Sequence, residues 1–419
     1  MGLKEFKILF DNPWKTYYPG QTVTGRIVVV LESPKKIRGI CVKMKGEANT
    51  SWTADKQKLN NEGRYENEQQ LLTGHEEYFS IKYYVIGNSS DGEIELPPGE
   101  NFYPFTCALP PNIPSSFESD LGHVRYTVKA ILDRPWKFDQ ETKDAFTVVS
   151  SFDLNTDSRA SEPIMEEKTK TFCCLCCASL PLSMNVSLPV RGYVPGQSMP
   201  IKVDIENQSG VRISTVKLSL QKVVTYRVNT PHTDTKTEWI TISEVSKGPV
   251  EGNDTVSYEQ VLDIPPLPPS NLNNCGIIDL KYELKSEACV EGWYRKNLRK
   301  STLVFIGTVP LANYQSLVAP AVQDYPTKDP AYGWNPVAPG DGAFPPSAPP
   351  PSAPQLPPDY TVTDSSPIGN LYPNLPPPSY EESVSGARSL RDRDESEHVM
   401  GIRGHFAPRY PVYNFAPAQ

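Results

Sequence analysis

Two tetrapeptides near the C-terminal end of the 419-residue chain carry the clearest chemistry in the sequence. Pro357-Pro358-Asp359-Tyr360 and Pro377-Pro378-Ser379-Tyr380 share the pattern Pro-Pro-x-Tyr. Consecutive prolines favour the polyproline II conformation before binding, so little chain entropy is lost when they dock in an aromatic groove. The tyrosine then fills a neighbouring pocket, as in ligands of WW domains. The predicted WW-binding residues are Pro357, Pro358, Tyr360, Pro377, Pro378 and Tyr380.

A proline-rich composition could produce such a tetrapeptide by chance, and the second copy is what argues against that explanation. The two copies begin 20 positions apart. If flexible, the residues between them would span about 20–25 Å. Tandem WW domains could therefore engage both copies, which would raise avidity by about 10²–10⁴ over one contact.

Two Pro-Ser-Ala-Pro words precede these motifs and resemble the late-domain motif read by the UEV domain of the ESCRT-I complex. A segment rich in Pro, Ser and Ala also generates such words by composition alone, and this plainer explanation stays open. The candidate UEV-binding residues are Pro346, Ser347, Ala348 and Pro349, and Pro351, Ser352, Ala353 and Pro354.

Four of the eight cysteines form a cluster in the middle of the chain: Cys173, Cys174, Cys176 and Cys177. Nearby apolar residues, together with Lys168 and Lys170, suit S-palmitoylation at a cytosolic membrane face, where several acyl chains would be needed for stable attachment. Zinc is a weaker alternative, because five consecutive residues cannot easily wrap one tetrahedral ion. An unmodified apolar segment is the third possibility. The other four cysteines stand alone, and we expect no disulfide framework.

Catalytic and cofactor chemistry find little support in the sequence. Only five histidines are present, and there is no Gly-x-Ser-x-Gly elbow, phosphate-binding glycine loop or His-Glu-x-x-His motif. We therefore expect no enzyme activity, no catalytic residues, no cofactor and no metal site. A net charge of −8 argues against nucleic acid as a partner. The N-terminal residues lack an apolar signal core, and no long apolar run is present, so we expect a cytoplasmic protein.

Alternating apolar and polar residues predict an all-β body. Ile201–Glu206, Val216–Gln221 and Val124–Ala130 follow a period of two, and turn-forming residues separate such runs. A repeat relates the two halves. Tyr18-Pro19-Gly20-Gln21 recurs around Pro195-Gly196-Gln197, and in this register several apolar positions coincide, including Ile27 with Val203 and Met44 with Leu220.

The repeat implies a duplicated sandwich domain and fixes the expected boundaries. We predict a first sandwich over residues 1–155, a linker with the cysteine cluster over 156–182, a second sandwich over 183–312 and a tail over 313–419. The tail is rich in Pro, Ala, Ser and Gly and loses all periodicity, so we expect it to be disordered. The charged run Arg388–Glu397 favours the same interpretation.

Residues 1–310 resemble the arrestin domain-containing (alpha-arrestin) family. The resemblance rests on the Pro-Gly-Gln turn in each half, on Phe102–Phe105 and Pro114–Glu118, on Val124–Ala130 and the following Arg134-Pro135-Trp136, and on Ile205–Ser209 and Leu303–Gly307. It implies two tandem immunoglobulin-like arrestin β-sandwiches. It also implies an adaptor that links membrane receptors or transporters, as cargo, to WW-domain HECT-type ubiquitin ligases and so promotes ubiquitination, endocytosis and sorting. A location at the cytoplasmic face of the plasma membrane and endosomes would follow. An ESCRT-linked vesicle-budding scaffold is the alternative.

Overall fold

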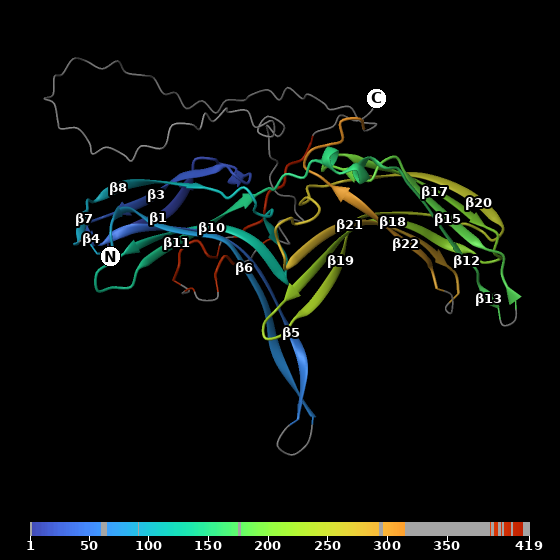
Figure 1. Ribbon diagram of the computed structural model, residues 1–419, viewed down its shortest axis with the longest axis horizontal. Helices are drawn as coiled ribbons and strands as arrows, with labels where there is room; N and C mark the ends of the chain where they lie inside the picture. Colours follow the sequence, from blue (N-terminus) through green and yellow to red (C-terminus); the bar gives the residue numbers. More distant parts are fainter. Residues whose placement is uncertain are drawn as a thin grey trace, which may run out of the picture.

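Two β-sandwiches lie end to end and form a curved body (Figure 1). The computed structural model describes residues 2–59, 65–90, 92–174, 177–292, 296–314, 386, 389–392, 395, 398–403 and 405–413. Two short 3-10 helices, η1 (Leu154–Thr156) and η2 (Ser158–Ser161), lie between the sandwiches in the chain. No helix in the described part of the chain is long and apolar enough to cross a bilayer.

The first sandwich packs a three-stranded sheet against a larger one. The small sheet has the order β1-β3-β8, with bounds Leu3–Phe10, Thr22–Leu31 and Gly99–Ala108. The large sheet has the order β2-β11-β10-β5-β6, with bounds Thr16–Tyr17, Gln140–Val148, Gly122–Asp133, Gly39–Leu59 and Tyr65–Gly87. Strand β9 (Phe117–Glu118) pairs with β10, and β4 (Lys35–Ile37) pairs with β7 (Ile94–Leu96).

The second sandwich repeats this plan. One sheet has the order β12-β15-β17-β20, with bounds Ile164–Lys170, Leu182–Leu188, Ser198–Asn207 and Asp254–Asp263. The other has the order β16-β22-β21-β18-β19, with bounds Gly192–Tyr193, Leu298–Ile306, Ile278–Val290, Ile213–Val228 and Asp234–Lys247. Strands β13 (Cys173–Cys174) and β14 (Cys177–Ala178) form a separate hairpin.

The repeat predicted from the sequence holds at the level of single hydrogen bonds. Gly20 and Gly196 both have a positive φ, of 83° and 92°, a conformation that glycine adopts without a steric penalty. The side chain of Gln21 accepts a hydrogen bond from Tyr18 N, and that of Gln197 accepts one from Val194 N, both at 2.9 Å. The matched apolar positions, such as Ile27 with Val203, are buried in both copies. The duplicated fold is therefore confirmed.

The predicted linker, residues 156–182, contains a strand of the second sandwich. Strand β12 (Ile164–Lys170) pairs with all of β15, from Ile164 opposite Leu188 to Lys170 opposite Leu182, and so belongs to the second sandwich. Only Ile164 in this strand is buried. An edge strand with one buried side chain shows no alternating pattern, which is why the sequence does not reveal it.

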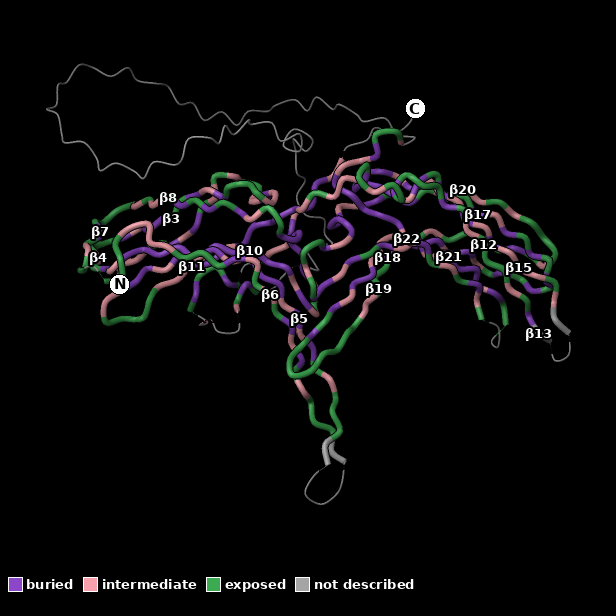
Figure 2. The backbone as a smooth tube through the Cα atoms, viewed as in Figure 1, coloured by how far each residue is buried: buried purple, intermediate pink, exposed green. Residues whose placement is uncertain are grey.

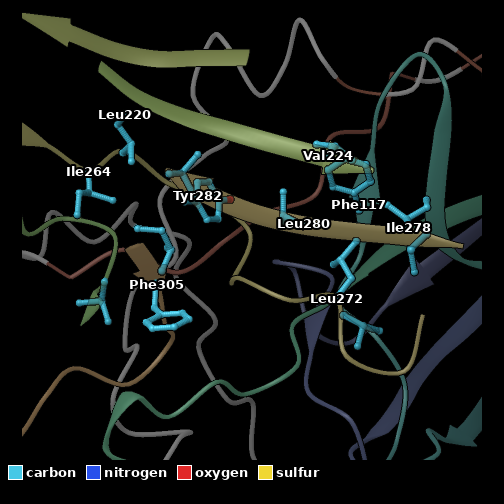
Figure 3. Close-up of a cluster of buried hydrophobic side chains, with 14 of the residues drawn as sticks. Phe117, Leu220, Val224, Ile264, Leu272, Ile278, Leu280, Tyr282 and Phe305 are labelled. Carbon is cyan, nitrogen blue, oxygen red and sulfur yellow. The ribbon is translucent and has the colours of Figure 1, made fainter. Parts of the chain in front are cut away.

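The two sandwiches share one continuous apolar core. Phe117, from strand β9 of the first sandwich, lies beside Val224 and Ile278 of the second (Figure 3). Polar bonds fix the same junction: Tyr226 donates to Ser119 Oγ at 2.9 Å, and Thr50 donates to the carbonyl of Arg227 at 2.6 Å. In Figure 2, backbone coloured as buried lies at the centre of the body, where the two sandwiches meet. The body is thus held as a unit, from which the long β5–β6 hairpin projects (Figure 1).

Candidate interaction surfaces

A segment near the C-terminus, comprising the described residues between 386 and 413, lies on the first sandwich; we call it the C-terminal segment. It joins the sheet at strand β11. Lys143 N donates to Met400 O at 2.9 Å, and Met400 N donates to Glu141 O at 2.8 Å, so Met400 pairs in parallel with Thr142. In Figure 1 the red chain follows the side of β10 and β11 that faces away from the sandwich core. The chain thus folds back on its own first domain.

Lysines of β10 and β11 hold two acidic residues of the C-terminal segment. Lys143 Nζ lies 2.8 Å from Asp392 and 3.0 Å from Glu395, and its side chain is only 1% exposed. Lys129 Nζ contacts Glu395 at 3.2 Å and Glu141 at 2.7 Å. Because a buried ammonium is costly without partners, the two carboxylates supply the opposite charges that the buried Lys143 side chain needs.

These charges also set the ionisation of Glu395. Burial alone would raise the pKa of this carboxyl group. The hydrogen bond from the backbone of Asp392 and the positive charges of Lys143 and Lys129 outweigh burial, so the pKa of Glu395 lies below its ordinary value. At neutral pH Glu395 is therefore a carboxylate held by two lysines.

Beside the acidic residues, a guanidinium and a tyrosine add further contacts. Arg125 is held by Glu118 at 2.7 Å and 2.9 Å, and its remaining nitrogen donates to Ser389 O at 3.3 Å. Tyr410 is buried and donates to Ser116 O at 2.9 Å. Leu390 packs in a small apolar cluster with Ala145. Charge, hydrogen bonds and apolar burial together specify this docking.

The end of the C-terminal segment reaches the second sandwich. Tyr413 N donates to Pro195 O at 3.0 Å, and its hydroxyl donates to Thr308 O at 3.1 Å. The Pro195-Gly196 turn admits this approach because Gly196 has no side chain, and a Cβ there would lie 1.9 Å from Tyr413 O. The segment therefore contacts both domains.

This docking corrects one expectation from the sequence. The composition of the charged run Arg388–Glu397 predicts disorder, yet residues 389–392 and 395 lie on the body with the contacts above. Local composition cannot show this, because the partner of the acidic residues is Lys143, far away in the chain. The one available signal is a set of apolar and aromatic residues after Glu397, of which Val399, Ile402 and Tyr410 are buried.

The predicted tail motifs lie outside the described residues, as do both Pro-Ser-Ala-Pro words and Cys176. The stretch 315–385 that carries the motifs is nevertheless bounded by residues with defined contacts. Tyr314 packs edge-on against Tyr193, with ring centroids 6.0 Å apart, and Gly386 lies against the backbone of Phe406 in the C-terminal segment. Both ends of the motif-bearing stretch are thus fixed to the body.

Three of the four clustered cysteines, Cys173, Cys174 and Cys177, lie in the β13–β14 hairpin at the far end of the second sandwich (Figure 1). Cys174 pairs with Cys177 across the hairpin, and Cys173 pairs with Ala178. Neighbouring Leu180 is exposed. Elsewhere in the chain, Cys41 and Cys107 are buried free thiols, and Cys275 and Cys289 are partly buried free thiols. Across the described ranges no group of three or more His, Cys, Asp or Glu is placed to hold a metal ion.

Comparison with known proteins gives matches over both sandwiches. Residues 6–155 match the family described as arrestin (or S-antigen), N-terminal domain, and residues 178–311 match the corresponding C-terminal domain. Arrestin domain-containing protein 17 of Caenorhabditis elegans is 30% identical over 98% of this chain and 99% of its own. Arrestin domain-containing protein 4 of Mus musculus is 27% identical over 74% of each chain. Arrestin domain-containing protein 1 of Rattus norvegicus is 30% identical over 67% of this chain and 60% of its own.

Proposed function

Because the chain belongs to the arrestin domain-containing (alpha-arrestin) family, we propose that it is a non-enzymatic adaptor that brings WW-domain HECT-type ubiquitin ligases to membrane-protein cargo. The sandwiches bind the cytosolic part of a receptor or transporter, and the two Pro-Pro-x-Tyr motifs recruit the ligase. Ubiquitination of the cargo or of the adaptor then directs endocytosis and sorting.

One observation carries this proposal: the stretch with both motifs starts and ends on the arrestin body. It leaves the body at Tyr314 and returns at Gly386, with Tyr360 and Tyr380 between these points. A ligase bound to these motifs is therefore kept close to whatever the sandwiches hold. Two sites on one tether also suit a partner with tandem WW domains, because the second binding event becomes intramolecular.

The test is a pull-down of tandem WW domains with the full chain. Tyr360→Ala/Tyr380→Ala should abolish binding, and each single substitution should weaken it by about 10²-fold or more if both motifs act together. Tyr372→Ala is the matched control, since Tyr372 is in the same stretch but outside a Pro-Pro-x-Tyr motif. If the wild-type chain fails to bind, or the double variant binds as well as wild type, ligase recruitment by these motifs is ruled out.

A vesicle-budding scaffold that uses ESCRT-I is the second candidate, and the two Pro-Ser-Ala-Pro words favour it. Pro349→Ala/Pro354→Ala leaves both tyrosines in place and so separates the two roles. Loss of vesicle release with intact WW binding would support the scaffold. Unchanged release would dismiss it.

Attachment at the plasma membrane and endosomes completes the proposal. The position of the β13–β14 hairpin, at one extremity of the body in Figure 1, supports acylation of this cluster because a membrane can approach there. Replacing Cys173, Cys174, Cys176 and Cys177 with Ser should remove acyl-exchange labelling of the protein in cells. Labelling that persists would contradict acylation at this cluster.

A further inference from the structure

The loop between β10 and β11, residues 134–139, exposes more apolar surface than its fold requires. Trp136 is 99% exposed and Phe138 is 94% exposed, the two highest values for large hydrophobic side chains in the described part of the chain. Scattered single apolar residues on a surface are ordinary. Two aromatic side chains that are both almost fully exposed on one six-residue loop are unusual. Such an exposed apolar patch indicates a binding role.

The loop has a defined conformation and is not merely left over between strands. Arg134 Nε donates to Phe138 O at 2.9 Å, and Arg134 N donates to Asp139 Oδ1 at 3.1 Å, so the two ends of the loop are tied together. Pro135 pre-sets the turn. Trp136 follows with a φ of 58°, a conformation that favours glycine or asparagine. A tryptophan in this conformation costs backbone free energy, and its exposed side chain gains no packing energy in the body. Strained residues of this kind are typical of binding sites.

Basic residues surround the two aromatic rings. A shallow hollow at the loop is lined by Arg38, Arg134, Trp136, Lys137 and Phe138, without a carboxylate in its lining. Lys35 lies nearby, and its pKa is lowered by burial and further by the charges of Arg134 and Lys137. Asp133 does pair with Arg38, at 2.5 Å. With Asp139 of the loop counted as well, four basic side chains lie here against two carboxylates, in a protein whose net charge is −8.

We propose that the 134–139 loop is a membrane-contact site that docks on anionic lipid headgroups. Trp136 and Phe138 enter the headgroup region, where amphipathic and aromatic rings are favoured, and Lys35, Arg134 and Lys137 face the lipid phosphates. A protein partner would need a surface that combines an apolar slot with negative charge. A bilayer with anionic lipids supplies both properties everywhere.

The placement of the loop agrees with a membrane on one side of the body. In Figure 1 the 134–139 loop, at the lower end of β11, and the β13–β14 hairpin with its cysteines lie at opposite ends of the molecule. Both point toward the side on which the β5–β6 hairpin projects. A single weak anchor binds membranes only marginally, whereas two separated anchors hold a body in a fixed orientation. This inference goes beyond the adaptor role, because it needs neither the tail motifs nor a cargo protein.

The experiment is vesicle flotation with the full chain produced in bacteria, which do not acylate the cysteines. Vesicles of phosphatidylcholine alone are compared with vesicles that also contain phosphatidylserine. We expect wild type to float with the anionic vesicles only. Trp136→Ser/Phe138→Ser should reduce the partition coefficient at least about tenfold, and Lys35→Gln/Lys137→Gln should remove the preference for phosphatidylserine. Quenching of tryptophan fluorescence by brominated lipid should fall in the Trp136 variant.

Trp239→Ser is the matched control, because Trp239 is also exposed, at 61%, but lies on β19, away from the loop. Its variant should float like wild type, and all variants should melt like wild type because the substituted side chains contribute little to the core. Absence of wild-type flotation would overturn the proposal. So would equal flotation of Trp136→Ser/Phe138→Ser, or equal loss in Trp239→Ser. Failure of the tail motifs to bind WW domains would not contradict this membrane-contact proposal.

Discussion

At the residue scale, Tyr126 and Tyr282 make equivalent contacts in the two sandwiches. Each is fully buried at the same place in its β-sandwich. The hydroxyl of Tyr126 donates to Pro114 O at 2.6 Å, and that of Tyr282 donates to Pro268 O at 2.7 Å. Each bond ties the proline-rich turn before the strand to the middle of the strand itself.

Removing either hydroxyl group should destabilise its own sandwich. Tyr126→Phe and Tyr282→Phe each leave a buried proline carbonyl without a donor, which costs about 1–3 kcal/mol. The free energy of unfolding in urea is the measurement. Tyr103→Phe is the control, because Tyr103 is half-buried and no hydrogen bond of its hydroxyl is found within the described residues. Unchanged unfolding in both variants would show that these hydroxyls do not matter for stability.

The pair Tyr126 and Tyr282 also shows what the sequence can predict. They fall in the similar segments Arg125-Tyr126-Thr127-Val128-Lys129 and Lys281-Tyr282-Glu283-Leu284-Lys285, so the sequence by itself indicates that the two tyrosines are equivalent. Lys143 shows what the sequence cannot predict. Its side chain is buried only because Asp392 and Glu395 return from the far end of the chain. No local pattern records a contact across that distance.

At the scale of elements, sequence patterns identify a strand where it has one wet and one buried face. Strand β17 alternates almost perfectly, and its alternation predicts it. Strand β12 and the short pairing at Met400 escape prediction, because an edge position leaves most side chains in water and removes the alternation. The predicted WW-binding and UEV-binding motifs rest on the sequence alone, because they lie outside the described residues.

Strand β6 meets β18 at a glycine, and this contact should control how the sandwiches join. A Cβ on Gly74 would lie 2.5 Å from Thr50 Oγ1 and 2.7 Å from Arg227 O. Gly74→Ala should therefore push the strands apart, break the 2.6 Å bond from Thr50 to Arg227, and lower the free energy of unfolding by about 1–3 kcal/mol. An increase in the distance between spin labels placed on the two sandwiches would report the separation.

Gly92→Ala provides the comparison for Gly74→Ala. Gly92 has open space around its Cα, so the added methyl group meets nothing within 4 Å. It should leave both stability and the interdomain distance unchanged. If Gly74→Ala behaves in the same way, the junction does not depend on this close approach.

At the scale of the whole molecule, the C-terminal segment closes the motif-bearing stretch into a loop on the body. Tyr380 precedes Gly386 by only six positions, so the second Pro-Pro-x-Tyr motif lies close in sequence to the docked residues. Because the segment contacts the first sandwich through Lys143 and the second through Pro195, its docking also depends on how the two domains sit together. Cargo binding that moves the domains would therefore act on the tail.

Acid should release the C-terminal segment from the first sandwich, because docking depends on the ionised form of Glu395. Docking lowers the pKa of this carboxyl group, because Lys143, Lys129 and the backbone of Asp392 outweigh its burial. Its contribution to docking is thus complete above the ordinary glutamate pKa of 4.5 and is lost as the pH falls through the lower, docked pKa. Energy transfer between a dye at the C-terminus and one on the first sandwich should fall in that range.

Glu395→Gln should reduce this energy transfer already at neutral pH and weaken its acid dependence. The control Glu259→Gln should match wild type, because Glu259 is exposed. Transfer that stays constant in acid and in Glu395→Gln would mean that apolar contacts, such as those of Leu390 and Tyr410, hold the segment without its charges.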